Sequence, residues 1–351
     1  MQVRHEAPSK PAPLRGYAAA PAIAAVMLVA TLIAGEHYGI GLRDPDGVIG
    51  ARLVFVFALV GIFWALDVFP RGIRRAVTNS APVLRSILGV ARERWSWRRA
   101  GTVVGLIIAF YITYLCYRNV KSYVPLARPE LMDYDLLEFE RSLFGENPAT
   151  LLHQLLGTGI TAHVLSTTYL LFLTFVPLSV AVALVWSTNM SAGLWWIAVL
   201  SLNWVLGAAS YFVLPSLGPA FASPELFADL PRTGTVALQD VLLEDRAAFL
   251  GSPIGSGALQ SIAAFASLHV SIVLSGVIVA HLLRAPRAFR IALWVYFVLT
   301  AIATIYFGWH YLVDDLGGVV IALVAVYGGA RMTGWRFEPI RSRTGILASR
   351  A

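Results

Sequence analysis

Long apolar runs recur along the chain and are separated by shorter polar segments. Eight runs are expected to be membrane-spanning helices, because a helix needs about 20 mostly apolar residues to cross a bilayer. They lie at about residues 18–34, 51–69, 101–117, 163–186, 193–214, 264–283, 289–307 and 312–330. The pattern predicts an all-α fold, a polytopic membrane bundle of about eight transmembrane helices whose last six form the core.

The composition supports residence in a membrane. The 351 residues are 58% hydrophobic and 13% charged, whereas soluble domains carry about 25% charged residues. This chain has too little polar surface to cover a water-facing globule. The basic residues behind the formal net charge of +7 are nearly all arginines in loops. Membrane orientation and contact with anionic membrane lipids account for them, so we expect no nucleic-acid partner.

The arginines gather in alternate loops. They are Arg71, Arg74, Arg75, Arg85, Arg92, Arg94, Arg98 and Arg99 after the second run, Arg284, Arg287 and Arg290 after the sixth, and Arg331, Arg336, Arg341, Arg343 and Arg350 after the eighth. With eight spans all of these segments fall on one side, which the positive-inside rule makes cytoplasmic. Both termini are therefore expected in the cytoplasm. The preference for Arg over Lys suits a GC-rich bacterium, so the expected location is the bacterial plasma membrane.

The same pattern divides the chain into three regions. Residues 1–100 are expected to hold two spans and a cytoplasmic basic segment, 71–100, that forms a helix lying in the membrane surface. Residues 101–335 are expected to form the transmembrane core, and residues 336–351 a cytoplasmic basic tail. The segment 215–263 is expected outside, where its Pro and Gly residues exclude one continuous helix.

Two of the seven histidines lie at span ends. His269 begins the sixth run and His310 follows the seventh, so both are expected at the non-cytoplasmic end of adjacent antiparallel spans. Ionisable groups at membrane depth are costly, which makes them functional candidates. We expect the two rings to face each other across a shallow cavity. Trp195, Trp196 and Trp309, also near span ends, are expected to be interfacial anchors instead.

The spacing from His310 to Asp314 is i, i+4, which would place both side chains on one face of a helix. A carboxylate bound to one imidazole nitrogen fixes the tautomer and leaves the other nitrogen as a nucleophile, which can attack phosphorus. His269 is then expected to protonate the leaving group and later to activate the acceptor. Asp315 is expected to point to another side of the helix.

At these residues the chain resembles the type 2 phosphatidic acid phosphatase superfamily. The superfamily's P-S-G-H motif resembles the segment that ends in Ser267 and His269, and its S-R-x-x-x-x-x-H-x-x-x-D motif resembles the segment with Thr304, His310 and Asp314. The resemblance covers roughly residues 100–330. It implies a catalytic core that transfers phosphoryl groups through a phosphohistidine, without a metal or another cofactor.

Three positions depart from these motifs. Ala266 replaces the usual Pro, Leu268 the usual Gly, and Thr304 the phosphate-binding Arg. These departures resemble the branch that contains the inositol phosphorylceramide synthases, which are phosphotransferases. The resemblance implies a lipid phosphate or lipid diphosphate as donor, reached from the extracytoplasmic side, and water or an alcohol such as inositol as acceptor. Ser267 and Thr304 are the candidate phosphate contacts.

The superfamily's first motif, K-x-x-x-x-x-x-R-P, is present from Lys121 to Arg128 and Pro129. It lies two spans earlier than in the simple phosphatases, where it directly precedes the second motif. A Pro-rich turn at 214–219 occupies that place here and resembles the synthase branch. Lys121 and Arg128 either fold back over the site as phosphate contacts or are ordinary juxtamembrane charges, and the sequence leaves both interpretations open.

Two other functions compete with this interpretation. The imidazoles and carboxylates of His269, His310, Asp314 and Asp315 could instead bind a metal ion and form a metal-dependent membrane hydrolase. A non-enzymatic transporter is the other alternative, but it predicts charged or broken helices near the bilayer midplane and often repeat symmetry. The runs contain almost no midplane charge and no evident repeat. We therefore expect a lipid phosphatase or phosphotransferase.

Overall fold

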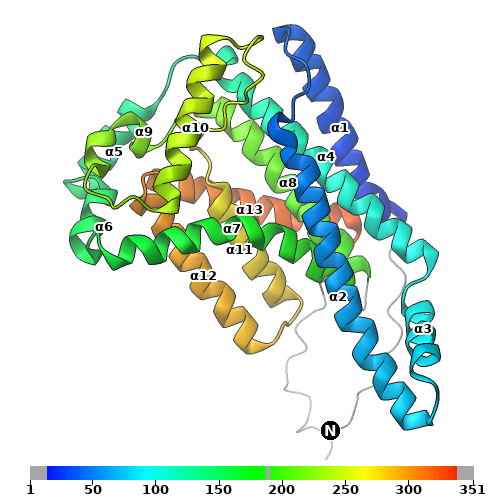
Figure 1. The fold of residues 1–351 in the computed structure, drawn as a ribbon. Helices are drawn as coiled ribbons and strands as arrows, with labels where there is room; N and C mark the ends of the chain where they lie inside the picture. Colours follow the sequence, from blue (N-terminus) through cyan, green and yellow to red (C-terminus); the bar gives the residue numbers. More distant parts are fainter. Residues whose placement is uncertain (1–13, 187–189, 338–351) are drawn as a thin grey trace, which may run out of the picture.

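The computed structural model describes residues 14–186 and 190–337, and the regular elements in these ranges are helices. Eight apolar helices correspond to the eight expected runs, which confirms a polytopic membrane helical bundle (Figure 1). They are α1 (Leu14–Tyr38), α2 (Val48–Asn79), α4 (Trp97–Ala127), α7 (Ile160–Val185), α8 (Met190–Val213), α11 (Leu268–Leu282), α12 (Arg287–Tyr306) and α13 (Leu312–Thr333). Seven of these helices are long and apolar enough to cross a membrane.

The eighth, α11, has 15 residues and a length of about 22 Å, less than the roughly 30 Å of a hydrocarbon core. The expected start at residue 264 was wrong, because the helix begins at Leu268 with Ser267 as its N-cap. The Ser210 hydroxyl accepts from the N–H of Ala266, and the Ser216 hydroxyl from that of Phe265. These two hydrogen bonds satisfy backbone N–H groups of the extended segment before the helix. Helix α11 therefore begins inside the bundle.

Helix α8 lies at the centre and packs against α1, α4, α11 and α13. Trp195 and Trp196 on α8 are buried in this core, and the indole N–H of Trp195 donates to the carbonyl of Val326 at 3.0 Å. The expectation that they are interfacial anchors was therefore wrong, because both side chains are buried in the hydrophobic core. Helix α1 packs on core helices as well. Only Arg336 and Phe337 of the expected tail 336–351 are among the described residues.

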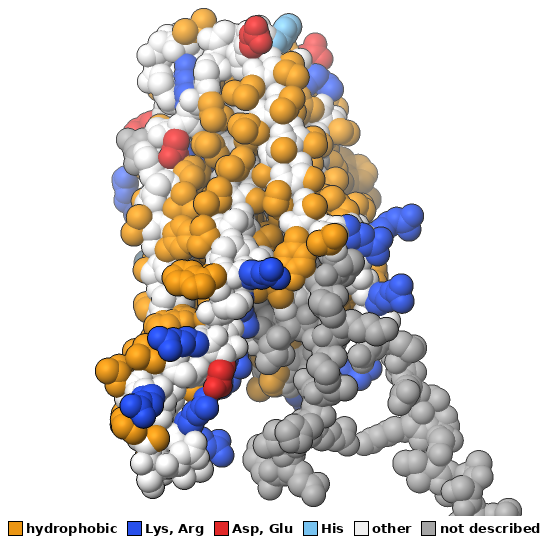
Figure 2. Space-filling view, turned by 90° about the vertical axis from the view of Figure 1, so that its right-hand side faces the viewer, with side chains coloured by type: hydrophobic (Ala, Val, Ile, Leu, Met, Phe, Trp, Pro, Cys, Tyr) orange, Lys and Arg blue, Asp and Glu red, His pale blue; other side chains and the backbone are white. Residues whose placement is uncertain are grey.

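The outer faces of α1 and α2 expose large apolar side chains, among them Val26, Ile33, Val54, Ile62 and Leu66. Figure 2 shows this face as a broad band of hydrophobic side chains, with Lys and Arg gathered mainly towards its lower end. A continuous apolar surface of this kind is unfavourable in water. It fits contact with lipid tails, as expected for membrane-spanning helices.

The basic segment 71–100 forms three elements rather than one surface helix. Its first part belongs to α2 and its last part to α4, and α3 (Val83–Arg94) folds back along α2 (Figure 1, lower right). The buried carboxylate of Asp67 pairs with Arg71 and Arg94 and so joins the two helices. The amphipathic pattern correctly predicted a helix but not its packing against α2.

Smaller helices cover the opposite end of the bundle. They are α5 (Asp133–Phe144), α6 (Pro148–Leu156), α9 (Pro219–Ala222) and α10 (Gly234–Gly251), and they gather at the upper left of Figure 1. As expected, the Pro- and Gly-rich segment 215–263 is not one helix. At this end α4, α8 and α12 finish and α7, α11 and α13 begin.

Candidate active site

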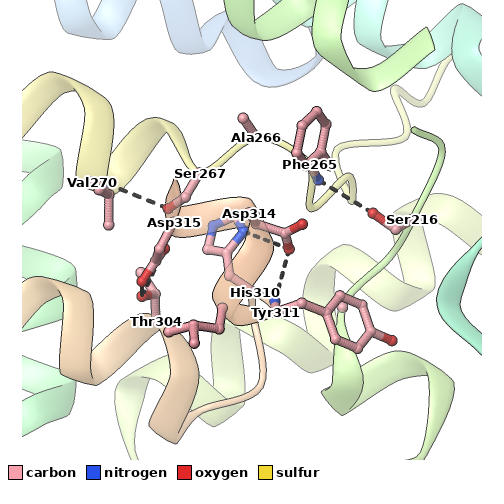
Figure 3. Close-up of polar contacts among 12 residues, drawn as sticks. Ser216, Phe265, Ala266, Ser267, Val270, Thr304, His310, Tyr311, Asp314 and Asp315 are labelled. Carbon is pink, nitrogen blue, oxygen red and sulfur yellow. Dashed lines mark hydrogen bonds and ion pairs between the residues drawn. The ribbon is translucent and has the colours of Figure 1, made fainter. Parts of the chain in front are cut away.

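His310 lies in the short connection between α12 and α13, and Asp314 lies in the first turn of α13. The His310 Nδ1 is 3.5 Å from the Asp314 Oδ2 (Figure 3). The expectation that both residues share a helix was wrong, because His310 precedes α13. The pair meets because Gly308, with φ of 63°, turns the chain towards the start of that helix. A Cβ there would lie 2.7 Å from the backbone nitrogen of Ala220.

Asp314 is held by the backbone around it. Its Oδ2 accepts a hydrogen bond from the N–H of Tyr311 at 2.8 Å, and its own carbonyl accepts from the N–H of Ser267 at 2.9 Å. The side chain is completely buried. The carboxylate therefore caps the first turn of α13, and the backbone carbonyl of Asp314 ties this turn to the start of α11. Together the two contacts fix the carboxylate beside the His310 ring.

His269, the second residue of α11, faces the same space. Its ring centroid is 6.2 Å from that of His310. Tyr169 stacks on the His269 ring at 4.3 Å with an interplanar angle of 23°, and Phe172 packs on it at 4.2 Å. Trp309 is buried and stacks on Tyr169, so it is not the expected interfacial anchor. These aromatic contacts from α7 fix the orientation of the second histidine.

Of the two motif cations, the structure brings only one towards the histidines. Lys121 lies on α4 with its Nζ 5.0 Å from the ring centroid of Tyr211, and its charge acts on both His269 and His310. Arg128 lies two helical turns further on, is exposed, and donates to the carbonyl of Phe212 at 2.8 Å. The two cations of one sequence motif therefore lie in different surroundings, Lys121 towards the histidines and Arg128 at the exposed end of α4.

The hydroxyls of Ser267 and Thr304 are buried and already engaged. Ser267 caps α11, and Thr304 donates to the carbonyl of Ala301 at 2.7 Å and lies 3.1 Å from the Asp315 carboxylate (Figure 3). The Ser267 hydroxyl also lies within hydrogen-bond reach of Asp315. The expectation for Asp315 was wrong: its side chain is buried between α11 and α12, beside the site, because neighbouring hydroxyls satisfy it there.

Burial lowers the pKa of His310 to about 4, because desolvation disfavours the imidazolium. The Asp315 carboxylate and the Ala264 carbonyl act in the opposite direction, while the Lys121 ammonium lowers the pKa further. The ring is therefore neutral at neutral pH. A neutral imidazole whose Nδ1 faces a carboxylate offers its Nε2 lone pair to an electrophile.

Sequence reasoning missed several residues around the site. Asp133 and Glu140 on α5 are buried and contact Tyr311 and Leu312. Arg246 on α10 is buried too and donates to the Gln260 side chain at 3.2 Å. The spacing of seven between the two acids was the available signal, since it places them on one face of a helix.

Within the described residues, no group of three or more His, Cys, Asp or Glu side chains is arranged to hold a metal ion. Comparison with known families gives one finding: the family model described as PAP2 superfamily matches residues 134–328. The match runs from α5 into α13 and includes His269, His310 and Asp314, but not Lys121 or Arg128. No curated protein and no solved structure matches the chain.

Proposed function

The chain belongs to the PAP2 superfamily, whose chemistry is that of phosphatases and phosphotransferases, and we propose that it transfers phosphoryl groups from a lipid-linked phosphate through a phosphohistidine on His310. The observation that carries the proposal is the approach of His310 Nδ1 to Asp314 Oδ2, with His269 facing the same space. The distance of 3.5 Å exceeds that of a normal hydrogen bond. Catalytic hydrogen bonds often shorten only in the complex with substrate.

In the first half-reaction, the Nε2 lone pair of His310 attacks phosphorus while the bond from phosphorus to the leaving oxygen breaks. His269 gives a proton to the leaving oxygen, and the anionic phosphate of the bound donor favours the imidazolium that this step requires. Asp314 holds the Nδ1 proton of His310 and stabilises the positive charge that develops on the ring. The products are the released alcohol or phosphate and a phosphohistidine.

In the second half-reaction, an acceptor oxygen attacks the phosphohistidine and the bond from phosphorus to nitrogen breaks. His269, now neutral, takes the acceptor's proton and returns to its starting state. Water as acceptor makes the protein a lipid phosphatase, and an alcohol such as inositol makes it a phosphotransferase. The Thr at position 304 and the Leu at 268 favour the second outcome through their likeness to the inositol phosphorylceramide synthases.

Lys121 and the N-terminus of α11 supply positive potential for the transferred group. The first N–H groups of a helix have no acceptor within that helix, and together with the helix dipole they favour an anion. The ammonium of Lys121, which acts on both histidines, would offset charge that builds on the phosphoryl oxygens. No metal or other cofactor is required in this scheme.

The membrane setting points to a lipid donor. The site lies at the end of the bundle opposite the Arg-rich connections, which makes it extracytoplasmic if arginines mark the cytoplasm. Because α11 is shorter than a full span, its N-terminus and His269 can meet a head group below the outer surface. A lipid phosphate or diphosphate of the outer leaflet is the donor class that fits this depth.

The test is to trap labelled phosphate from lipid phosphate and diphosphate donors in detergent, with a chelator present. The wild type would be compared with His310→Ala, His269→Ala and, as a matched control, His163→Ala, whose side chain is exposed on α7. We expect an acid-labile, base-stable label that only His310→Ala abolishes, and a released product that identifies water or inositol as acceptor. Turnover that requires a divalent ion, or no label from any donor, would contradict the proposal.

A further inference from the structure

Helix α5 carries two buried carboxylates on one face. Asp133 and Glu140 are 5% and 2% exposed and lie seven residues apart, which is about two helical turns. Neither belongs to the catalytic groups above, and α5 is not one of the membrane-spanning helices. Carboxylates are almost never fully buried unless specific partners satisfy them. Their partners therefore indicate what this face of α5 does.

Glu140 binds the backbone next to the nucleophile. Its Oε1 accepts a hydrogen bond from the N–H of Leu312, the first residue of α13. Leu312 lies midway between His310 and Asp314 along the chain. A helix leaves its first N–H groups without internal acceptors, and a carboxylate at that end is favoured by the helix dipole. Glu140 supplies this acceptor from another helix, so it ties α5 to the turn that holds the catalytic pair.

Asp133 binds both that turn and a second loop. Its Oδ1 accepts from the Tyr311 hydroxyl at 2.9 Å, and the carboxylate also accepts from the N–H groups of Leu217 and Gly218 at 3.0 Å. Tyr311 is completely buried and directly follows His310. One carboxylate thus joins α5 and the Pro-rich turn at 214–219 to the residue beside the nucleophile.

The Pro-rich turn extends this connection to two other segments of the site. The carbonyl of Ser216 accepts from the N–H of Ala264, and the carbonyl of Gly308 accepts from that of Ala220, both at 2.9 Å. Gly218 lies so close to Trp309 that a Cβ would approach its carbonyl oxygen to 2.4 Å. The segments before Ser267 and before His310 therefore rest on a turn that Asp133 fixes.

We propose that Asp133 and Glu140 are positioning residues, which hold the His310–Leu312 turn so that the imidazole stays in reach of Asp314 and of the donor phosphorus. The inference rests on the proposed function for its effect on turnover, but the restraint itself is a property of the fold. A connection between helices is free to move unless its backbone is tied. Displacement of a reacting group by about 1 Å can cost on the order of 100-fold in rate.

The experiment compares Glu140→Ala and Glu140→Gln with Asp135→Ala, a control that removes an exposed acid from the same helix. Hydrogen exchange of the peptide around Leu312 and steady-state kinetics would be measured on each folded variant. We expect Glu140→Ala to speed exchange at that peptide and to lower kcat by about 10- to 100-fold with little change in KM. Glu140→Gln keeps an acceptor oxygen, so its exchange at the Leu312 peptide and its kcat should lie close to those of the wild type. Asp135→Ala should match the wild type in both measurements.

Tyr311→Phe tests the Asp133 contact by the loss of one hydroxyl, a change that leaves the buried ring in place. It is expected to lower kcat in the same direction and to speed exchange in the same peptide. Folded Glu140→Ala and Tyr311→Phe with wild-type exchange would overturn the inference. If the wild type turned over no donor, the proposed function would be contradicted. The exchange measurements would still test whether Asp133 and Glu140 hold the turn.

Discussion

The hydroxyl of Thr304 on α12 lies 3.1 Å from the carboxylate of Asp315 on α13 and shares its one proton between this carboxylate and the Ala301 carbonyl. Thr304 stands where the related motif carries its phosphate-binding arginine. The residue that departs from the motif therefore contacts a buried acid on the neighbouring helix. The chain therefore lacks a cation at this point and has a polar contact that joins two helices. A positive charge that acts on both histidines comes from Lys121 on α4 instead.

The first prediction concerns this contact. Thr304→Val keeps the side-chain shape but leaves the buried Asp315 carboxylate without one of its donors, which typically costs about 1–3 kcal/mol. We expect a lower midpoint of thermal unfolding in detergent. Thr167→Val is the matched control, because the Thr167 hydroxyl is exposed and bonds only within α7. Equal midpoints for the two variants would mean that the Asp315 contact contributes nothing to stability.

The second prediction concerns the orienting carboxylate. Asp314→Asn removes the negative charge that faces His310 Nδ1 but leaves one oxygen to accept from the Tyr311 N–H. We expect kcat to fall by about 10²- to 10⁴-fold, the range found when an orienting carboxylate or an acid–base partner is lost. The variant should also form phosphohistidine more slowly in single-turnover labelling. Labelling at the wild-type rate would assign Asp314 to helix capping alone.

The third prediction separates the two motif cations. Lys121→Met removes a charge that acts on both histidines, whereas Arg128→Met removes an exposed one bound to a backbone carbonyl. We expect kcat/KM to fall by about 10- to 100-fold for Lys121→Met, because a charge that stabilises the transition state is lost. Arg128→Met should change it by less than about 3-fold. A larger effect at Arg128 would indicate that the motif acts as one unit on the substrate.

The helices could be predicted from sequence because each apolar run is a local signal that satisfies the length needed to cross a membrane. The start of α11 could not. Residues 264–266 are apolar and lie inside the expected run 264–283. They stay extended because the distant Ser210 and Ser216 hydroxyls accept hydrogen bonds from the N–H groups of Ala266 and Phe265. Periodicity does not detect an acceptor that lies about fifty residues away.

The candidate site, like the helices, could be predicted from the sequence only in part. The spacing predicted that His310 and Asp314 meet, but the turn at Gly308 brings them together rather than a shared helix face. The approach of His269 follows from the alternation of the spans. Asp133 and Glu140 could not be assigned, because their partners Tyr311 and Leu312 lie 178 and 172 positions along the chain. The different positions of Lys121 and Arg128 could not be predicted from the sequence either, because they depend on which part of α4 is buried in the bundle. Catalytic roles for all of these residues stay predictions until the variants are measured.

The last prediction concerns the pH dependence of kcat/KM. Burial lowers the pKa of His310 to about 4, the Asp315 carboxylate raises it, and the Lys121 ammonium lowers it. Protonation of His310 removes the nucleophile, so the acid limb of kcat/KM should lie near that pKa, with activity lost as the pH falls through it. Loss of the Lys121 charge should move the limb to higher pH, because an ammonium that disfavours the imidazolium is removed.

The measurement is kcat/KM from pH 3.5 to 8 for the wild type and Lys121→Met, with Arg128→Met as the control that should leave the limb in place. The stability of the folded protein should also fall as the pH falls. Because the folded-state pKa of His310 lies below the ordinary value of about 6.5, the unfolded chain takes up a proton first as the pH falls. The protein should therefore lose stability between pH 6.5 and 4, as proton uptake favours the unfolded state. A limb that stays in place or moves to lower pH in Lys121→Met would show that His310 does not control the acid side of the profile, and the nucleophile would then have to be sought elsewhere.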